Sequence, residues 1–168
     1  MEKHKIIILT LLAVSISNFV AGQTSKKLKI SNSIEMNNGM DEVWTAISNL
    51  GNLDRLVPEI IERTEMVGNG EGSIVTLILK SNGARVVESI TKLDNKKRII
   101  SYEMLETPMP MSYYKATISI VSKNSDTYNI RFEAILKTEE ENKETMFNTI
   151  DNFQKTLLYN VKNIYNEK

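Results

Sequence analysis

Apolar residues recur at two different spacings along the chain, and the change between them separates a strand-rich part from a final helix. Between residues 27 and 137, apolar and polar positions alternate in short runs, which is typical of strands with one buried face. From Thr138 to Lys168, apolar residues recur at steps of three and four, the spacing of one helix face. The pattern predicts a sheet followed by one long amphipathic helix.

Seven strands and two short helices are predicted before the long helix. The short helices cover residues 40–50 and 53–57, and Pro58 ends the second because proline disfavours a helical residue before it. The predicted strands cover residues 27–36, 61–67, 73–80, 85–93, 99–106, 112–122 and 127–137.

Turn-forming residues separate the strands by short connections. Asn82-Gly83 is the strongest hairpin signal among them. Because short connections make neighbouring strands antiparallel, we expect one meandering sheet rather than an array of strand–helix–strand units. Thr138 and Glu141 have the spacing of a capping box and predict the start of the long helix.

The apolar stripe of the long helix contains one polar residue, Gln154. At roughly 100° per residue, this amide lies on the same face as Ile150, Leu157 and Val161. A lone amide directed at the interior predicts a cavity between the helix and the sheet. Alternatively, Gln154 bonds a backbone group of the sheet or turns toward the rim.

Strand alternation predicts which side chains face the helix. Val86, Glu88 and Ile90 share one face of their strand, so Glu88 is an acid on an otherwise apolar face. A buried carboxylate without a partner is costly. Glu88 therefore either pairs with Arg85 or Arg131 or lines a pocket, and both alternatives stay open. The other predicted inward sets are Val75, Leu77 and Leu79; Ile100, Tyr102 and Met104; and Tyr114, Ala116, Ile118 and Ile120.

The first 22 residues have the pattern of a signal peptide. Lys3 and Lys5 precede a mostly apolar run over residues 6–20, and small residues up to Gly22 suit a cleavage site before Gln23. The alternative is an uncleaved anchor, but the run is short for a bilayer span of about 20 residues. We expect export to the periplasm or medium of a bacterium, with residues 23–168 as one ligand-binding domain and no stable membrane span after cleavage.

The residue types present exclude several kinds of chemistry. The sequence has no cysteine, and its one histidine, His4, lies within the predicted signal peptide. The exported part can therefore form neither a cysteine nucleophile, nor a Ser-His-Asp triad, nor an imidazole or thiolate metal site. We expect no metal and no cofactor. Lys plus Arg and Asp plus Glu each total 21, and no basic face argues for nucleic acid.

Several segments, in order, resemble one known superfamily. The order of elements and residues 42–53, 72–77, 83–88, 93–102 and 108–114 are similar to the START-like, or SRPBCC, helix-grip superfamily. The resemblance is to its polyketide cyclase/dehydrase branch, which is near in pattern to the plant abscisic-acid receptors. It implies an α+β fold in which a curved seven-stranded antiparallel sheet wraps around the long helix, with two short helices after the first strand.

The resemblance also implies a site. In the hormone receptors, positions that match Glu88, Tyr102, Tyr114 and Gln154 line the ligand cavity. The receptors' ligand-pairing lysine and their loop residues have no counterpart here, so a neutral or weakly polar apolar ligand is expected rather than a carboxylate-bearing hormone. The family pattern places Glu133 inward, whereas alternation places it outward, and this stays open. The predicted ligand-binding residues are Leu77, Leu79, Glu88, Tyr102, Met104, Tyr114, Ile150 and Gln154.

Three functions are compatible with these patterns. The first is a non-enzymatic exported carrier or sensor that holds a small hydrophobic molecule. The second is an enzyme of cyclase or hydrolase type without a metal, in which Glu88 acts as general acid or base and Tyr114 or Gln154 orients a carbonyl. The third is a periplasmic accessory protein with a collapsed cavity and an unknown protein partner. The absence of His and Cys favours the first.

Overall fold

A computed structural model describes residues 25–37, 39–124 and 126–165 of the chain. The predicted signal peptide and the last three residues of the predicted C-terminal helix lie outside this described part. The described elements, in chain order, are β1 (Lys26–Asn37), α1 (Met40–Ser48), a 3-10 turn (Leu50–Asn52), α2 (Leu53–Leu56), β2 (Ile61–Val67), β3 (Ile74–Leu79), β4 (Arg85–Asp94), β5 (Ile99–Glu106), β6 (Met111–Ser122), β7 (Thr127–Thr138), a 3-10 turn (Glu140–Asn142) and α3 (Lys143–Tyr165).

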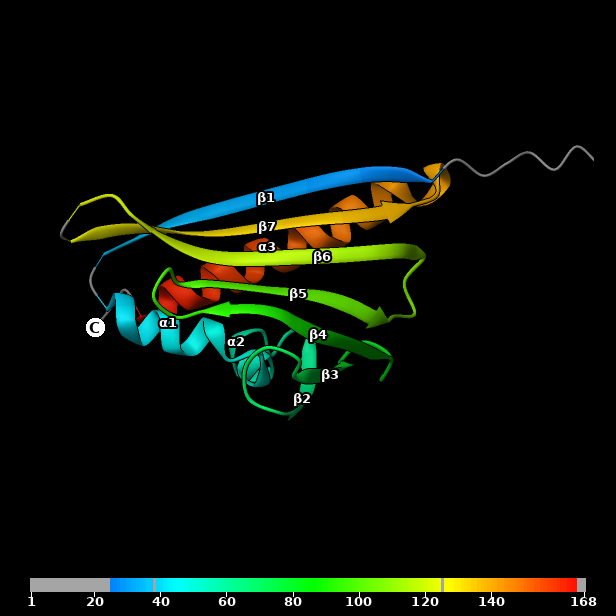
Figure 1. Ribbon diagram of the computed structural model, residues 1–168. Coiled ribbons are helices and arrows are strands. Elements are labelled where there is room, and N and C mark those ends of the chain that lie inside the picture. Colours follow the sequence, from blue (N-terminus) through cyan, green and yellow to red (C-terminus); the bar gives the residue numbers. More distant parts are fainter. Residues whose placement is uncertain (1–24, 38, 125, 166–168) are drawn as a thin grey trace, which may run out of the picture.

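The seven strands form one curved antiparallel sheet with the order β1-β7-β6-β5-β4-β3-β2 (Figure 1). From β2 to β7 each strand pairs with the next one in the chain, as short connections predict, and β1 then pairs with β7. The β3–β4 hairpin turns at Asn82-Gly83, where Gly83 has a φ of 68° and the side chain of Asn82 accepts a hydrogen bond from the Ala84 amide. The predicted fold class is confirmed.

The C-terminal helix begins later than the capping-box pattern predicts. Thr138 ends β7, where it pairs with Lys26 of β1 and Met111 of β6. Its Oγ1 donates a hydrogen bond to the carbonyl of Pro110 at 2.5 Å rather than accepting one from a helical amide. The predicted start at Thr138 is therefore wrong, because pairing on both sides holds this β-branched residue in the sheet. The helix proper begins at Lys143.

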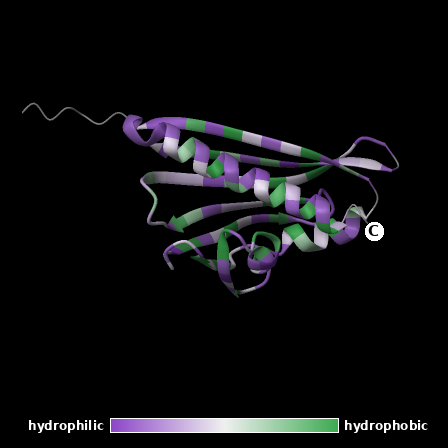
Figure 2. Ribbon diagram, turned by 180° about the vertical axis from the view of Figure 1, so that it is seen from behind, coloured by the Kyte–Doolittle hydropathy of each residue, from purple (hydrophilic) through white to green (hydrophobic). Residues whose placement is uncertain are grey.

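One face of α3 lies against the concave side of the sheet (Figure 2). The helix packs chiefly against β1, and its later part contacts the short helices, where Asn160 donates a hydrogen bond to the Leu56 carbonyl. Gln154 is fully buried on this face, as predicted. Phe147 and Ile164, which the spacing also places in the apolar stripe, are 40% and 41% exposed, because the sheet covers a narrower strip than the stripe occupies. The buried residues of α3 are Met146, Ile150, Gln154, Leu157, Leu158 and Val161.

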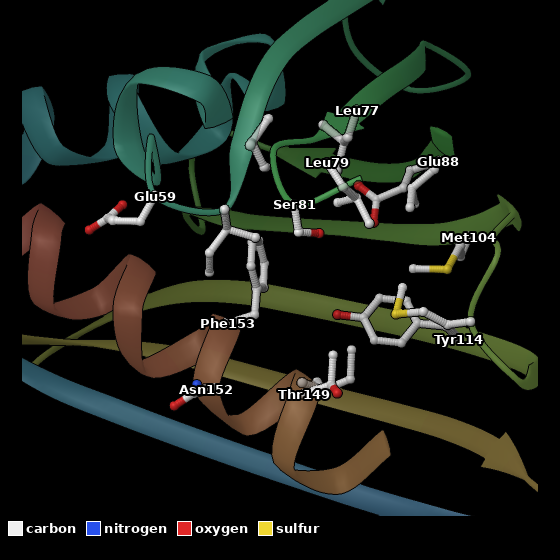
Figure 3. A pocket seen from close by; sticks show the side chains of 15 residues that line it. Glu59, Leu77, Leu79, Ser81, Glu88, Met104, Tyr114, Thr149, Asn152 and Phe153 are labelled. Atoms are coloured by element: carbon white, nitrogen blue, oxygen red, sulfur yellow. The ribbon is translucent and has the colours of Figure 1, made fainter. Parts of the chain in front are cut away.

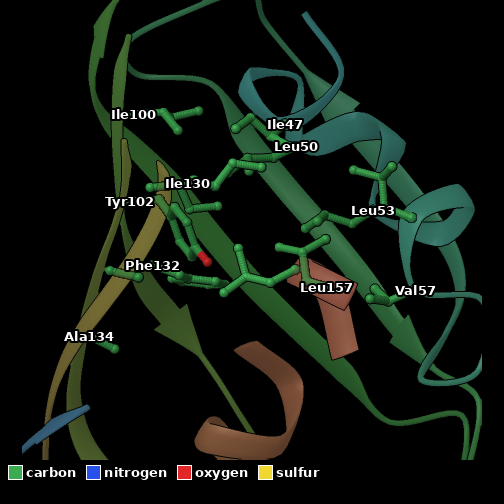
Figure 4. Packing of buried hydrophobic residues seen from close by; sticks show 14 of the residues in the cluster. Ile47, Leu50, Leu53, Val57, Ile100, Tyr102, Ile130, Phe132, Ala134 and Leu157 are labelled. Atoms are coloured by element: carbon green, nitrogen blue, oxygen red, sulfur yellow. The ribbon is translucent and has the colours of Figure 1, made fainter. Parts of the chain in front are cut away.

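Alternation along the strands fills the space between sheet and helix. Figure 4 shows Tyr102, Phe132 and Leu157 meeting in the core, with Leu50 and Leu53 from the short-helix region closing one end. The four predicted inward sets are buried or half-buried, which confirms the prediction of faces.

Glu133 lies on the outer face of β7. The strand alternates without interruption, so Phe132 and Ala134 are buried and Glu133 is exposed. Its Cα partners are Ser31 on β1 and Thr117 on β6. The open question about Glu133 is thus resolved in favour of alternation, and no bulge turns this side chain inward.

No helix in the described part of the chain is both long enough and apolar enough to span a membrane.

Candidate ligand pocket

A pocket of about 400 Å³ lies between the sheet and α3, on the side of the helix away from β1 (Figure 3). Its inner wall is buried, whereas Glu59, Ser81, Thr149 and Asn152 form an exposed rim. The pocket therefore has a mostly apolar interior and a mouth that solvent reaches. Its lining residues are Glu59, Ile60, Ile61, Leu77, Leu79, Ser81, Val86, Glu88, Met104, Met109, Tyr114, Thr149, Ile150, Asn152 and Phe153.

Glu88 reaches the pocket from β4. Alternation turns it inward with Val86 and Ile90, and the pairing of β4 with β5 shifts register between Val87 and Glu88. Only 4% of the residue is exposed, and its Oε2 has no hydrogen-bond partner. Burial raises the pKa of the Glu88 carboxyl from its ordinary value of 4.5 to about 8. Glu88 is consequently mostly protonated at neutral pH.

The structure pairs neither candidate arginine with Glu88. Arg85 lies on the outer face and binds Glu106, with 3.0 Å between Nη1 and Oε2. Arg131 is exposed on β7, and neither arginine contributes to the pKa of Glu88. The alternative of an ion pair at Glu88 is therefore wrong, since alternation places both arginines on the opposite side of the sheet from the carboxyl. Glu88 therefore lines the pocket, which was the other alternative.

Two tyrosines accompany Glu88, but only one of them lines the pocket. The hydroxyl of Tyr114, on β6, points into the cavity in Figure 3. Tyr102, on β5, lies behind it in the core, with 6.3 Å between ring centroids and 44° between ring planes. Burial, and then the charges of neighbouring acidic groups, raises the pKa of both phenols above the ordinary value of 10. Both hydroxyls thus keep their protons at any physiological pH.

Gln154 is buried but does not line the pocket. It faces β1, where its Oε1 accepts a hydrogen bond of 3.0 Å from Nδ2 of Asn32. The same nitrogen donates to Asp151 at 2.8 Å, and Lys155 holds Asp151 from the solvent side at 2.7 Å. These contacts lower the pKa of Asp151, with the Lys155 hydrogen bond as the largest cause. Gln154 thus belongs to a polar cluster between α3 and β1, and its Nε2 has no partner.

The pocket gathers most, but not all, of the predicted ligand-binding residues. Leu77, Leu79, Met104 and Ile150 line it together with Glu88 and Tyr114, whereas Tyr102 and Gln154 do not. Sequence reasoning missed the rim and the flank of α3 that carries Thr149, Asn152 and Phe153. Of these, only Phe153 belonged to the apolar helical pattern.

Asn32 was also missed, although a local signal exists. It lies on the inward face of β1 and is the only polar member of the row that runs from Leu28 to Met36. A polar residue in an inward row needs a partner in the structure. The two polar exceptions, Asn32 on the strand and Gln154 on the helix, supply each other's partner.

The part of the chain that the structure describes contains no group of three or more His, Cys, Asp or Glu side chains placed to hold a metal ion.

Comparison with family models identifies one family. The model described as polyketide cyclase/dehydrase and lipid transport matches residues 27–161, which include all seven strands and most of α3. Comparison with curated protein sequences gives no match.

Solved structures of low sequence identity share the fold. The protein XoxI from Bacillus cereus superposes with a TM-score of 0.73 and 19% identity, covering 82% of this chain and 94% of its own. Zhui aromatase/cyclase from a Streptomyces species gives 0.72 and 16%, covering 81% and 92%. Truncated norcoclaurine synthase from Thalictrum flavum gives 0.71 and 21%, covering 86% and 98%. Identities this low establish a common architecture only.

Proposed function

Because the chain belongs to the polyketide cyclase/dehydrase and lipid transport family, we propose that it is a binding protein that holds a small hydrophobic molecule between the sheet and α3. The observation that carries the proposal is the pocket itself. Its volume of about 400 Å³ lies in the range of small-molecule sites, and its walls are mostly aliphatic with a few convergent polar groups. The functional class is a carrier or sensor rather than a catalyst.

A pocket-filling substitution tests this proposal. Leu79 lines the pocket, whereas its neighbour Ile78 points to the other face of β3, so the two positions form a matched pair. Leu79→Trp should abolish the fluorescence gain of the neutral probe N-phenyl-1-naphthylamine, and Ile78→Trp should leave it intact. Native mass spectrometry of freshly purified wild-type protein should show a bound small molecule. Absence of both probe binding and co-purified ligand would refute the proposal.

Export is a second component of the proposed function. The charged start, the apolar run over residues 6–20 and the small residues before Gln23 support it. Expression of the full chain in a bacterium, followed by fractionation and intact mass measurement, tests it. We expect periplasmic or secreted protein that begins at Gln23. Cytoplasmic protein of full mass would contradict this component without affecting the pocket.

Proton transfer at a carbonyl compound is a second candidate function, favoured by one observation. Glu88 is a buried acid whose pKa of about 8 lies near neutrality, and the Tyr114 hydroxyl points into the same space. Gln154 lies outside the pocket and takes no part. If the protein is an enzyme, it should speed deuterium uptake at the carbon next to the carbonyl of 2-decanone. Glu88→Gln should remove this activity while retaining binding, and an unaccelerated exchange rate would dismiss the candidate.

The third hypothesis, an accessory protein with a collapsed cavity, receives no support from the pocket region. Met109, from the loop between β5 and β6, lines the pocket instead of forming part of an outer apolar patch. The cavity is open rather than filled by neighbouring side chains. A protein partner is therefore not needed to explain the apolar residues of this loop.

A further inference from the structure

The ionisable groups that line the pocket are all acids. Its lining contains two carboxyl groups, Glu59 at the rim and Glu88 at the inner wall, and includes neither lysine nor arginine. The side chain of Lys80 lies nearby but donates its hydrogen bond to the Pro58 carbonyl at 3.0 Å. Glu59 is held by the neutral amide of Asn160, at 2.8 and 3.1 Å, so its charge is not neutralised.

The inner wall also presents an acceptor that no group of the protein satisfies. Oε2 of Glu88 is buried without a hydrogen-bond partner. The titratable groups that face Glu88 are Tyr102 from β5 and Tyr114 from β6, both acids that stay protonated, while α3 brings the uncharged Thr149, Ile150 and Phe153 to the pocket. An anionic ligand would meet no lysine or arginine here to balance its charge, whereas a cation can take the place of the Glu88 proton and pair with the carboxylate that remains.

We propose that the pocket selects molecules with an apolar body and a protonated amine, whose ammonium group binds the carboxylate of Glu88. This inference rests on the proposed binding function and adds the chemical class of the ligand. The aliphatic wall formed by Leu77, Leu79 and Ile150 surrounds the apolar body. The hydroxyl of Tyr114 points into the same cavity as Glu88, and its oxygen offers the ammonium group a further acceptor.

Binding of such a ligand should release a proton from the protein, whereas binding of a neutral ligand should not. With a pKa of about 8, Glu88 is about nine-tenths protonated at pH 7. When an alkylammonium ion binds, the carboxyl loses its proton to the buffer, and the ammonium keeps all of its own. The salt bridge forms without any covalent change. About 0.9 protons should therefore appear in solution for each ligand bound at pH 7.

Titration calorimetry with a matched pair of probes tests the inference. Decylamine and 1-decanol have the same ten-carbon chain and differ only in the head group. Measurements in two buffers of different ionisation enthalpy give the number of protons released. For the wild type we expect decylamine to bind about tenfold more tightly than decanol or better, with proton release only for the amine. Raising the pH from 7 to 9 should reduce the released protons toward zero, since Glu88 is then already ionised.

Two variants separate the head-group contact from general effects. Glu88→Gln keeps the size of the side chain and should bind both probes equally without proton release. Glu65→Gln removes an exposed carboxylate of β2 that pairs with Arg63 outside the pocket, and it should behave as wild type. Equal binding of both probes by wild-type protein, without proton release, would overturn the inference and leave the proposed function standing. Binding of neither probe would overturn both.

Discussion

Ionisation of Glu88 should make the stability of the fold depend strongly on pH. The carboxyl has a pKa of about 8 in the folded protein and 4.5 in its ordinary state, which we take for the unfolded chain. Between these values the folded protein binds more protons than the unfolded chain, so the free energy of unfolding falls as the pH rises. At about 1.4 kcal/mol for each unit of pKa, the complete loss amounts to about 5 kcal/mol. The loss is absent below pH 4.5 and complete above pH 8.

Substitution of Glu88 by Gln isolates this effect from other titrating groups. The amide has nearly the same shape and does not ionise, so the difference between the two proteins reports Glu88 alone. From pH 5 to pH 7 the variant should gain about 2.5 kcal/mol relative to wild type, and little more should be gained above pH 8.

Urea unfolding followed by circular dichroism at pH 5, 7 and 9 measures the difference directly. Tyr114→Phe serves as a control, because the phenol does not titrate in this range and its variant should keep the wild-type pH dependence. A difference between wild type and Glu88→Gln that stays constant from pH 5 to 9 would refute the reasoning. It would mean that the carboxyl is as well solvated in the folded protein as in the unfolded chain.

Three further substitutions test the packing around the site by urea unfolding at pH 6, with Ser33→Ala on the exposed face of β1 as the control. Leu157→Ala should cost about 2–5 kcal/mol, because the side chain is buried in the core and leaves a cavity. Asn32→Ala should cost about 1–3 kcal/mol, since it leaves the buried Gln154 without its partner. Gly83→Val should cost about 1–2 kcal/mol, because its φ of 68° strains a β-branched residue. If a substitution lowers the free energy of unfolding no more than Ser33→Ala does, the corresponding argument is wrong.

The strands were predictable because local pattern and tertiary structure agree along the sheet. Alternation determines the face of each residue, and turn residues such as Asn82-Gly83 mark where the chain reverses. The start of α3 was not predictable in this way. Thr138 has a side chain that suits a helix cap, and only its pairing with Lys26 and Met111 shows that the strand continues through it. Those partners lie far away in the sequence.

The candidate site was predictable in part for a related reason. Periodicity places Gln154 on the inner face of α3, but it does not give the position of that residue across the width of the sheet. Asn32 attracts Gln154 toward β1, so the amide ends on the opposite side of the helix from Glu88. Thr149 and Asn152 lie on the exposed flank and resemble any surface residue in sequence. Their place at the pocket rim depends on the position of α3 across the sheet, which periodicity does not give.

The docking of α3 on one side of the sheet explains why a pocket exists at all. Asn32 and the apolar residues of β1 hold the helix beside that strand, and Asn160 ties its later part to the carbonyl of Leu56 at 2.9 Å. A helix fixed at these points cannot also contact β3 and β4 along their whole length, because the sheet curves away from it. The space that remains is bounded by apolar side chains and, at its inner wall, by the carboxyl of Glu88. Tight packing on the β1 side thus accounts for an open, acidic site on the other.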